Sequence, residues 1–206
     1  MTLDFFFVHL QGNMDKTKGK EHVILVDADY VDGVASTLMH DFQGMLGHEI
    51  PLVDMADWLV CCALDAGLGQ APANEVQVIF VRSVGKMVMA CFNPGDLASQ
   101  LDGKAFRDSQ LGEFLLSSIC DEQVNAGKPL MVQCAETLLS DKQTRTLALV
   151  ADLQRYGDDL CALQEQASKC RVTLLSMTPT PDTPWNNVQL GYSLMHAMGI
   201  SPEEFK

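Results

Sequence analysis

The segment His22-Val23-Ile24-Leu25-Val26-Asp27-Ala28-Asp29-Tyr30-Val31-Asp32 joins two patterns that together set the fold. Its first half is an apolar run of strand length, and three acids follow within six residues. From Val31 onward, apolar residues recur at i, i+3, i+4, i+7, i+8 and i+11, which is the stripe of an amphipathic helix. The pattern predicts a buried strand that passes straight into a helix, with carboxylates gathered at the turn.

Four more apolar segments of strand length follow, at residues 75–81, 114–120, 146–151 and 171–177. Segments with helical periodicity lie between the strands, and helices are expected at 31–42, near 58–64, at 130–140 and at 156–168. A last helix is expected after the final strand, at 187–198. Strands that alternate with helices form a mainly parallel sheet, and right-handed crossovers cover both of its faces. The sequence therefore predicts an α/β fold: a doubly wound, mainly parallel five-stranded sheet of Rossmann-like or PIN-like type, with helices on both faces and an extra C-terminal helix.

On this interpretation the chain has three parts. Residues 1–20 are a flexible N-terminal leader, residues 21–178 the α/β domain, and residues 179–206 a proline-rich linker with a C-terminal packing helix. The leader lacks the basic region and the small-residue cleavage site of a signal peptide, and either Met1 or Met14 is the translation start. The last helix is apolar around most of its circumference, so it packs either on a second copy, giving a homo-oligomer, or over its own core.

Charge restricts the partners. Asp and Glu number 27 against 14 Lys and Arg, a net charge of −13. Nucleic-acid affinity comes mainly from cationic side chains that displace counterions, so the balance disfavours nucleic acid and leaves only a local basic groove open. It also disfavours anionic membrane surfaces, and no apolar segment approaches the length of a membrane span.

The seven cysteines point to a reducing compartment. Their number is odd, no C-x-x-C pair occurs, and most lie inside apolar runs, where a free thiol behaves as a small hydrophobe. We therefore expect reduced, buried thiols and a cytoplasmic location. A zinc site, a redox pair or a thiol nucleophile that meets a histidine in space are the alternatives.

Candidate site residues follow the predicted strands. Doubly wound sheets bind ligands beyond the carboxyl ends of their strands, where the strand order switches. If the order is 3-2-1-4-5, the first and fourth strands are neighbours, and Asp27, Asp29 and Asp152 point into one crevice. Clustered carboxylates hold a hard cation such as Mg²⁺ or Mn²⁺, or one of them protonates. The accessory candidates at the other strand ends are Asp32, Arg82, Asp121 and Glu122.

A structural role for the same acids is the alternative. Asp29 fits the N-cap position of the following helix, Asp32 then falls at N3, and Asp152 fits a cap at the end of its strand. No glycine-rich phosphate loop follows the first strand, which argues against a dinucleotide or P-loop protein.

The sequence from 22 to 177 resembles the NYN group of the PIN-like nuclease superfamily. That group opens with a strand of the form apolar-apolar-Asp-x-x-Asn/Asp, which Val26-Asp27-Ala28-Asp29-Tyr30 resembles. A later strand, acidic element, helix and closing strand correspond to residues 147–156 and 171–175. The resemblance implies that Asp27, Asp29 and, with a shift of register, Asp152 are metal ligands, and that residues 21–178 form a PIN/NYN-like domain.

Two departures from that pattern bear on function. The late element of the group carries two acids, whereas here Leu153-Gln154-Arg155 follows Asp152; the preceding helix supplies Glu136 but no acid near its start. The whole chain is also similar to an uncharacterised bacterial family of about this length. We expect a module with reduced or no nuclease activity that serves interaction or regulation, as a homodimer. A Mg²⁺- or Mn²⁺-dependent ribonuclease that uses the strand-end aspartates is the alternative.

Overall fold

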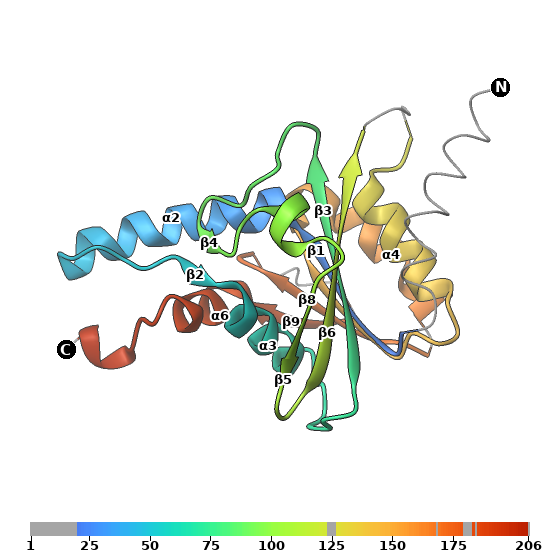
Figure 1. Ribbon diagram of the computed structural model, residues 1–206. Coiled ribbons are helices and arrows are strands. Elements are labelled where there is room, and N and C mark those ends of the chain that lie inside the picture. The colour runs from blue at the N-terminus through green and yellow to red at the C-terminus, as the bar shows by residue number, and fades with distance from the viewer. Residues whose placement is uncertain (1–19, 123–126, 168, 179–182, 184, 206) are drawn as a thin grey trace.

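The predicted junction of strand and helix lies at the centre of the molecule. The computed structural model describes residues 20–122, 127–167, 169–178, 183 and 185–205, and in it β1 (His22–Asp27) passes without a loop into α2 (Ala28–Leu46). Asp27 caps the start of α2, and Gly47 ends it in the left-handed conformation at φ 72°. The 19-residue helix therefore projects well beyond the sheet (Figure 1).

β1 is the middle strand of a seven-stranded mixed sheet with the order β5-β6-β3-β1-β7-β8-β9. The other strands of this sheet are β3 (Glu75–Ser83), β5 (Ala105–Asp108), β6 (Gly112–Asp121), β7 (Thr146–Val150), β8 (Arg171–Ser176) and β9 (Asn186–Gln189). A separate two-stranded sheet joins β2 (Val53–Asp54) to β4 (Phe92–Asn93). The other helices are α3 (Met55–Asp65), α4 (Leu130–Ser140), α5 (Leu153–Cys161) and α6 (Leu190–Ala197), with short turns η1 (Leu97–Leu101), η2 (Gln164–Ala167) and η3 (Pro202–Phe205).

The α/β class is confirmed, but the count of five strands is wrong. The five predicted strands are β1, β3, β6, β7 and β8, and they lie side by side, all parallel, in the order β6-β3-β1-β7-β8. Among the described residues two further strands lie at the edges: β5 antiparallel to β6, and β9 parallel to β8. Both have four residues and no apolar run, because an edge strand has only one neighbour and meets water.

The predicted start of the last helix, at residue 187, is also wrong. Residues 186–189 extend the sheet as β9, paired with residues 173–176 of β8, and α6 begins only at Leu190. α6 buries Leu190 and Leu194 in the core that α2 and α3 share. Tyr192, by contrast, is 71% exposed. Most of the apolar circumference of the helix is therefore covered by its own domain.

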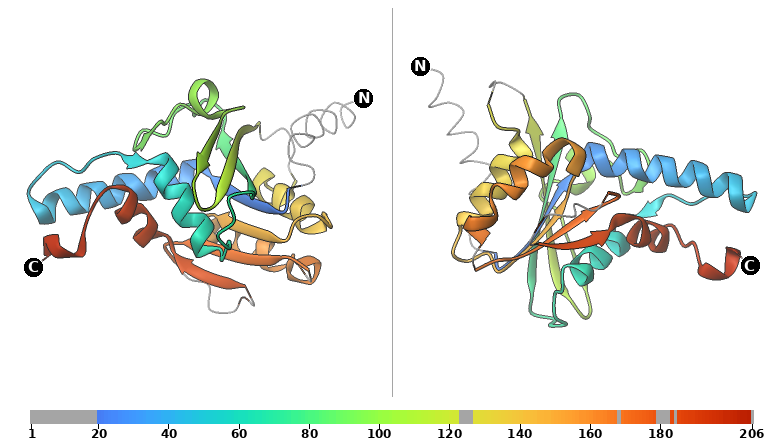
Figure 2. Two further views of the ribbon diagram at one scale, coloured as in Figure 1. Left: turned by 60° about the horizontal axis from the view of Figure 1, so that its bottom comes forward. Right: turned by 180° about the vertical axis from the view of Figure 1, so that it is seen from behind.

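Helices cover both faces of the sheet, as expected for a doubly wound fold. Alternate residues of β1 divide between two cores: Ile24 and Val26 pack under α2, α3 and α6, while Val23 and Leu25 pack under α4 and α5. The right view of Figure 2 shows these two layers on opposite sides of the strands. The fold thus has one helical layer built around α2 and another around α4.

Several expectations concern residues near the ends of the chain. The leader up to residue 19, with Met1 and Met14, and most of the proline-rich linker (179–182 and 184) lie outside the described residues, so the division at 20 and 178 stays a prediction. All seven cysteines lie within the described part, and every one is an unpaired thiol. No helix in the described ranges is long and apolar enough to cross a membrane.

Candidate functional site

The carboxyl ends of β1 and β7 lie side by side in the sheet. The chain runs from β1 toward β3 on one side and from β7 toward β8 on the other, so the strand order switches between them. Asp27 is the last residue of β1, and Asp152 follows β7 after one residue. The fold therefore brings the predicted residues Asp27, Asp29 and Asp152 to the edge at which such sheets bind ligands.

Asp27 caps α2 from within the sheet. Its Oδ1 accepts a hydrogen bond from the backbone N–H of Tyr30 at 3.1 Å, and the residue is only 7% exposed. The assignment of Asp29 as the N-cap, with Asp32 at N3, is therefore wrong. The helix begins with Ala28, three residues before the apolar stripe on which the assignment rests.

The environment of Asp27 favours its neutral form. Burial is the main cause that raises the pKa of this carboxyl, and the negative charges of Asp29 and Asp152 raise it further. The hydrogen bond from Tyr30 and the positive charge of Arg155 act in the opposite direction. A buried acid with a raised pKa beside other acids is a common feature of functional sites, although structural networks produce it as well.

Tyr156 and Arg155 belong to the same site, and sequence reasoning missed both. Tyr156 of α5 is 4% exposed; burial raises the pKa of its hydroxyl, and the charge of Asp27 and a side-chain hydrogen bond to Asp27 add to this shift. The guanidinium carbon of Arg155 lies 4.9 Å from the centre of the Tyr156 ring. The spacing along the sequence could have indicated Tyr156, which is four residues after Asp152 and four before the inward-facing Leu160. Residues four apart lie on the same face of a helix.

Asp29 and Asp32 each accept a hydrogen bond from a backbone N–H far away in the sequence. Asp29 Oδ2 accepts from the N–H of Ser83, the last residue of β3, at 2.9 Å. Asp32 Oδ1 accepts from the N–H of Cys91, also at 2.9 Å, and its Oδ2 lies 3.8 Å from the ammonium group of Lys86. The two carboxylates therefore connect α2 to the end of β3 and to the loop that follows it.

Asp152 is the N-cap of α5, as the structural alternative predicts. Its Oδ1 accepts from the N–H of Gln154 at 2.9 Å. Asp121 ends β6, and its charge helps to raise the pKa of Tyr156, so it faces the same edge of the sheet. Glu122 is exposed to solvent.

Arg82 points toward its own loop. Its Nη1 donates to the carbonyl of Lys86 at 3.3 Å. Its Nε is buried and has no hydrogen-bond partner among the described residues. Arg82 therefore shapes the turn after β3.

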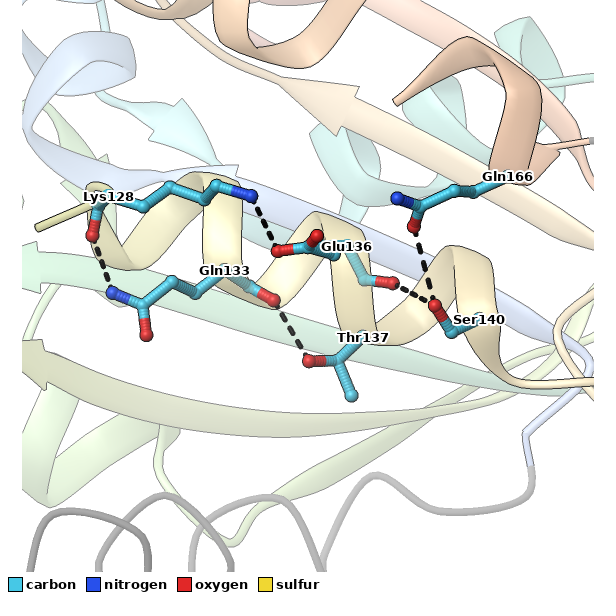
Figure 3. A network of polar contacts seen from close by, with 6 residues as sticks. All are labelled: Lys128, Gln133, Glu136, Thr137, Ser140 and Gln166. Atoms are coloured by element: carbon cyan, nitrogen blue, oxygen red, sulfur yellow. Dashed lines mark hydrogen bonds and ion pairs between the residues drawn. The ribbon is translucent and has the colours of Figure 1, made fainter. Parts of the chain in front are cut away.

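The described acids do not gather into a set of metal ligands. Within the described ranges, no three His, Cys, Asp or Glu side chains are close enough together to hold a metal ion. Glu136, the acid on α4, accepts instead from the ammonium of Lys128 at 2.7 Å on the outer surface, and that bond lowers its pKa (Figure 3). The assignment of Asp27, Asp29 and Asp152 to a metal stays a prediction.

Three of the thiols are poor nucleophiles. Burial raises the pKa of Cys134 to about 12 and that of Cys170 to about 11, and it raises the pKa of Cys62 well above the usual thiol range. A thiol attacks as its thiolate, so these side chains are inert at neutral pH.

Comparison with known proteins gives a family and no activity. Comparison with curated proteins returns no match, and neither does comparison with solved structures. One family model matches residues 16–205, nearly the whole chain, and its description is a family of unknown function, DUF6621. The chain belongs to this family.

Proposed function

We propose that the chain is a NYN/PIN-like α/β module that acts by binding other molecules and has reduced or no nuclease activity. The supporting observation is the use of its strand-end acids. Asp27, Asp29 and Asp152, the residues that the resemblance assigns to a metal, each accept a backbone N–H at 2.9 to 3.1 Å. A carboxylate that organises a helix start or a loop has part of its hydrogen-bonding capacity already used, which disfavours its transfer to a cation.

The test is cleavage of labelled single-stranded RNA by the full chain with Mg²⁺ or Mn²⁺, beside the Asp27→Asn variant. We expect no cleavage above that of the variant, and no heat of Mg²⁺ or Mn²⁺ binding in calorimetry. Metal-dependent cleavage that Asp27→Asn abolishes would overturn the proposal. It would establish the alternative, a metal-dependent ribonuclease, which the position of Asp27 at the switch point, near Asp29 and Asp152, favours.

The proposal includes a homo-oligomer formed through the C-terminal helix. Tyr192 supports it, because this large side chain is 71% exposed on a helix that is otherwise largely buried. Tyr192→Ser should lower the oligomeric mass measured by light scattering. Met45→Ser, which changes a side chain that is 63% exposed at the far end of α2, is the matched control and should leave the mass unchanged. A monomeric wild-type protein would contradict this part.

We further propose that the module works in the cytoplasm. Seven unpaired thiols support this, because disulfides persist in oxidising compartments and thiols in reducing ones. Fractionation of cells that produce the chain tests it, and recovery outside the cytoplasm would contradict it.

A further inference from the structure

A second candidate site lies at the opposite end of the sheet, where the parallel strands begin. An open pocket of about 370 Å³ is lined there by residues of β1, β7 and β8 and by the loop 67–69 that follows α3. His22, Thr146 and Arg171 are partners in the register of the three strands, so they project to the same face in one row. This volume lies in the range of pockets that hold small ligands.

The charge of the pocket contrasts with that of the whole chain. Arg145, Lys169 and Arg171 all line it, and no acid does, in a protein of net charge −13. An acid lies just outside the lining: Oε1 of Glu21 is 3.2 Å from Nε of Arg145. A guanidinium group has five N–H donors, so that pair leaves the two Nη groups of Arg145 available. The pocket therefore presents concentrated positive charge with unused donors.

Arg171 is held in place by a loop of fixed shape. Gly67 is in the left-handed conformation at φ 77°, and the N–H groups of Gly67 and Leu68 close the end of α3 on Leu64 and Ala63. The carbonyl of Gly67 then accepts from Nη1 of Arg171 at 3.0 Å. One donor of Arg171 is used for positioning, and the rest of its planar fork remains for a ligand.

A ring nitrogen of His22 is a second observation, independent of the charge, that points to a ligand in this pocket. Its Nδ1 is buried and has no hydrogen-bond partner among the described residues, which is costly for a ring nitrogen. His22 and Thr146 also line a smaller cavity of about 10 Å³ beneath the same end of the sheet. Because this nitrogen is buried, a ligand oxygen would reach it through a water in the small cavity, which would supply the partner that the described residues do not provide.

We propose that this pocket binds a small phosphorylated molecule through its phosphate group. Arginine forks, an ammonium, a hydroxyl and an imidazole match the several oxygens of a phosphate better than the two of a carboxylate. Glu21 pairs with Arg145 and offsets one of the three positive charges, and the remaining charge suits a dianion. A nucleic-acid backbone would need a broad basic face, which a chain of net charge −13 disfavours. The binding goes beyond the proposed function and does not depend on the acids at the other end of the sheet.

The test is titration of the full chain with inorganic phosphate and with pyrophosphate. Binding is measured by the amide chemical shifts of the protein and by calorimetry. Saturable shifts confined to His22, residues 67–69, Thr146 and their neighbours are expected. Arg145→Gln combined with Lys169→Gln should weaken binding about tenfold or more, since hydrogen bonds from charged groups are worth at least that factor. Both side chains are exposed, so the fold should be unaffected.

The matched control is Lys104→Gln combined with Arg107→Gln. It removes the same charge at and beside β5, an edge strand that β6 and β3 separate from the strands of the pocket. This pair should keep the wild-type affinity within about twofold. The proposal is overturned by absent or scattered shifts, by an equal loss in the control pair, or by an equal response to acetate.

Discussion

The two ends of the sheet use charge in opposite ways. At the carboxyl end, Asp27, Asp29 and Asp152 accept hydrogen bonds from backbone N–H groups that start helices or fix a loop. At the amino end, Arg145, Lys169 and Arg171 surround an open pocket, and His22 has a buried ring nitrogen without a partner among the described residues. At the carboxyl end, where the sequence predicts the site, the acids already accept hydrogen bonds within the fold. At the amino end, where no site is predicted, several side-chain donors remain unused. The state of the hydrogen bonds, and not the density of charge, distinguishes the two.

The largest effect is expected at the carboxyl end, for Asp27→Ala. The change removes the cap of α2 and leaves the N–H of Tyr30 and the buried hydroxyl of Tyr156 without this carboxylate. We expect the free energy of unfolding to fall by about 2–3 kcal/mol in denaturant titration. Asp54→Ala, which removes the exposed cap of α3, should cost only about 1 kcal/mol. Equal losses would show that the buried contacts of Asp27 add nothing.

At the amino end, Gly67→Ala should affect both stability and binding. The left-handed conformation costs a residue with a side chain about 1–2 kcal/mol, and the new Cβ would lie 3.1 Å from Nη1 of Arg171. Phosphate affinity should therefore fall along with stability. Gly47→Ala is the control: Gly47 has a similar φ of 72°, but no atom lies within 4 Å of the added Cβ. It should lose similar stability and keep phosphate binding; unchanged binding in Gly67→Ala would argue against the placement of Arg171.

A smaller effect concerns pH. The folded-state pKa of Asp27 is raised, mainly by burial, above the unfolded value of 3.8. The stability that its neutral form contributes is complete below pH 3.8 and is lost as the pH rises through the folded pKa. Asp27→Asn keeps an N-cap side chain without that charge, so it should gain stability relative to wild type as the pH rises. Parallel stability profiles of the two proteins from acid to neutral pH would contradict a raised pKa of Asp27 in the folded state.

The elements predicted correctly are those whose pattern of apolar residues lies within one continuous stretch of sequence. The strand at 22–27 and the helix after it follow from residues that are neighbours in the chain. β5 and β9 were missed because polar edge strands such as Asn186–Gln189 are stabilised by pairing and not by burial. The cap was assigned to Asp29 because the apolar stripe begins at Val31, whereas Ala28 already belongs to the helix.

The candidate sites depended on contacts that no local pattern contains. Asp29 meets Ser83, 54 residues away, and Asp32 meets Cys91, 59 residues away, so sequence could not show that these acids were already bound. The basic pocket was missed for a different reason. Its bases precede or begin strands, as Arg145 and Arg171 do, whereas ligand sites of doubly wound sheets are expected after the strands.

The central claim is that the strand-end acids stabilise the fold and do not bind a metal. The sign of the change in the free energy of unfolding when two of them are removed tests this claim most directly. The measurement is the free energy of unfolding of wild type and of the variant that combines Asp29→Ala with Asp152→Ala, each with and without Mg²⁺. We predict that the variant is less stable by about 1–2 kcal/mol and that Mg²⁺ changes neither protein, because each carboxylate loses a structural hydrogen bond. Ligands held close together for a metal repel one another without it. A variant more stable than wild type, together with a wild type that Mg²⁺ stabilises, would contradict the claim.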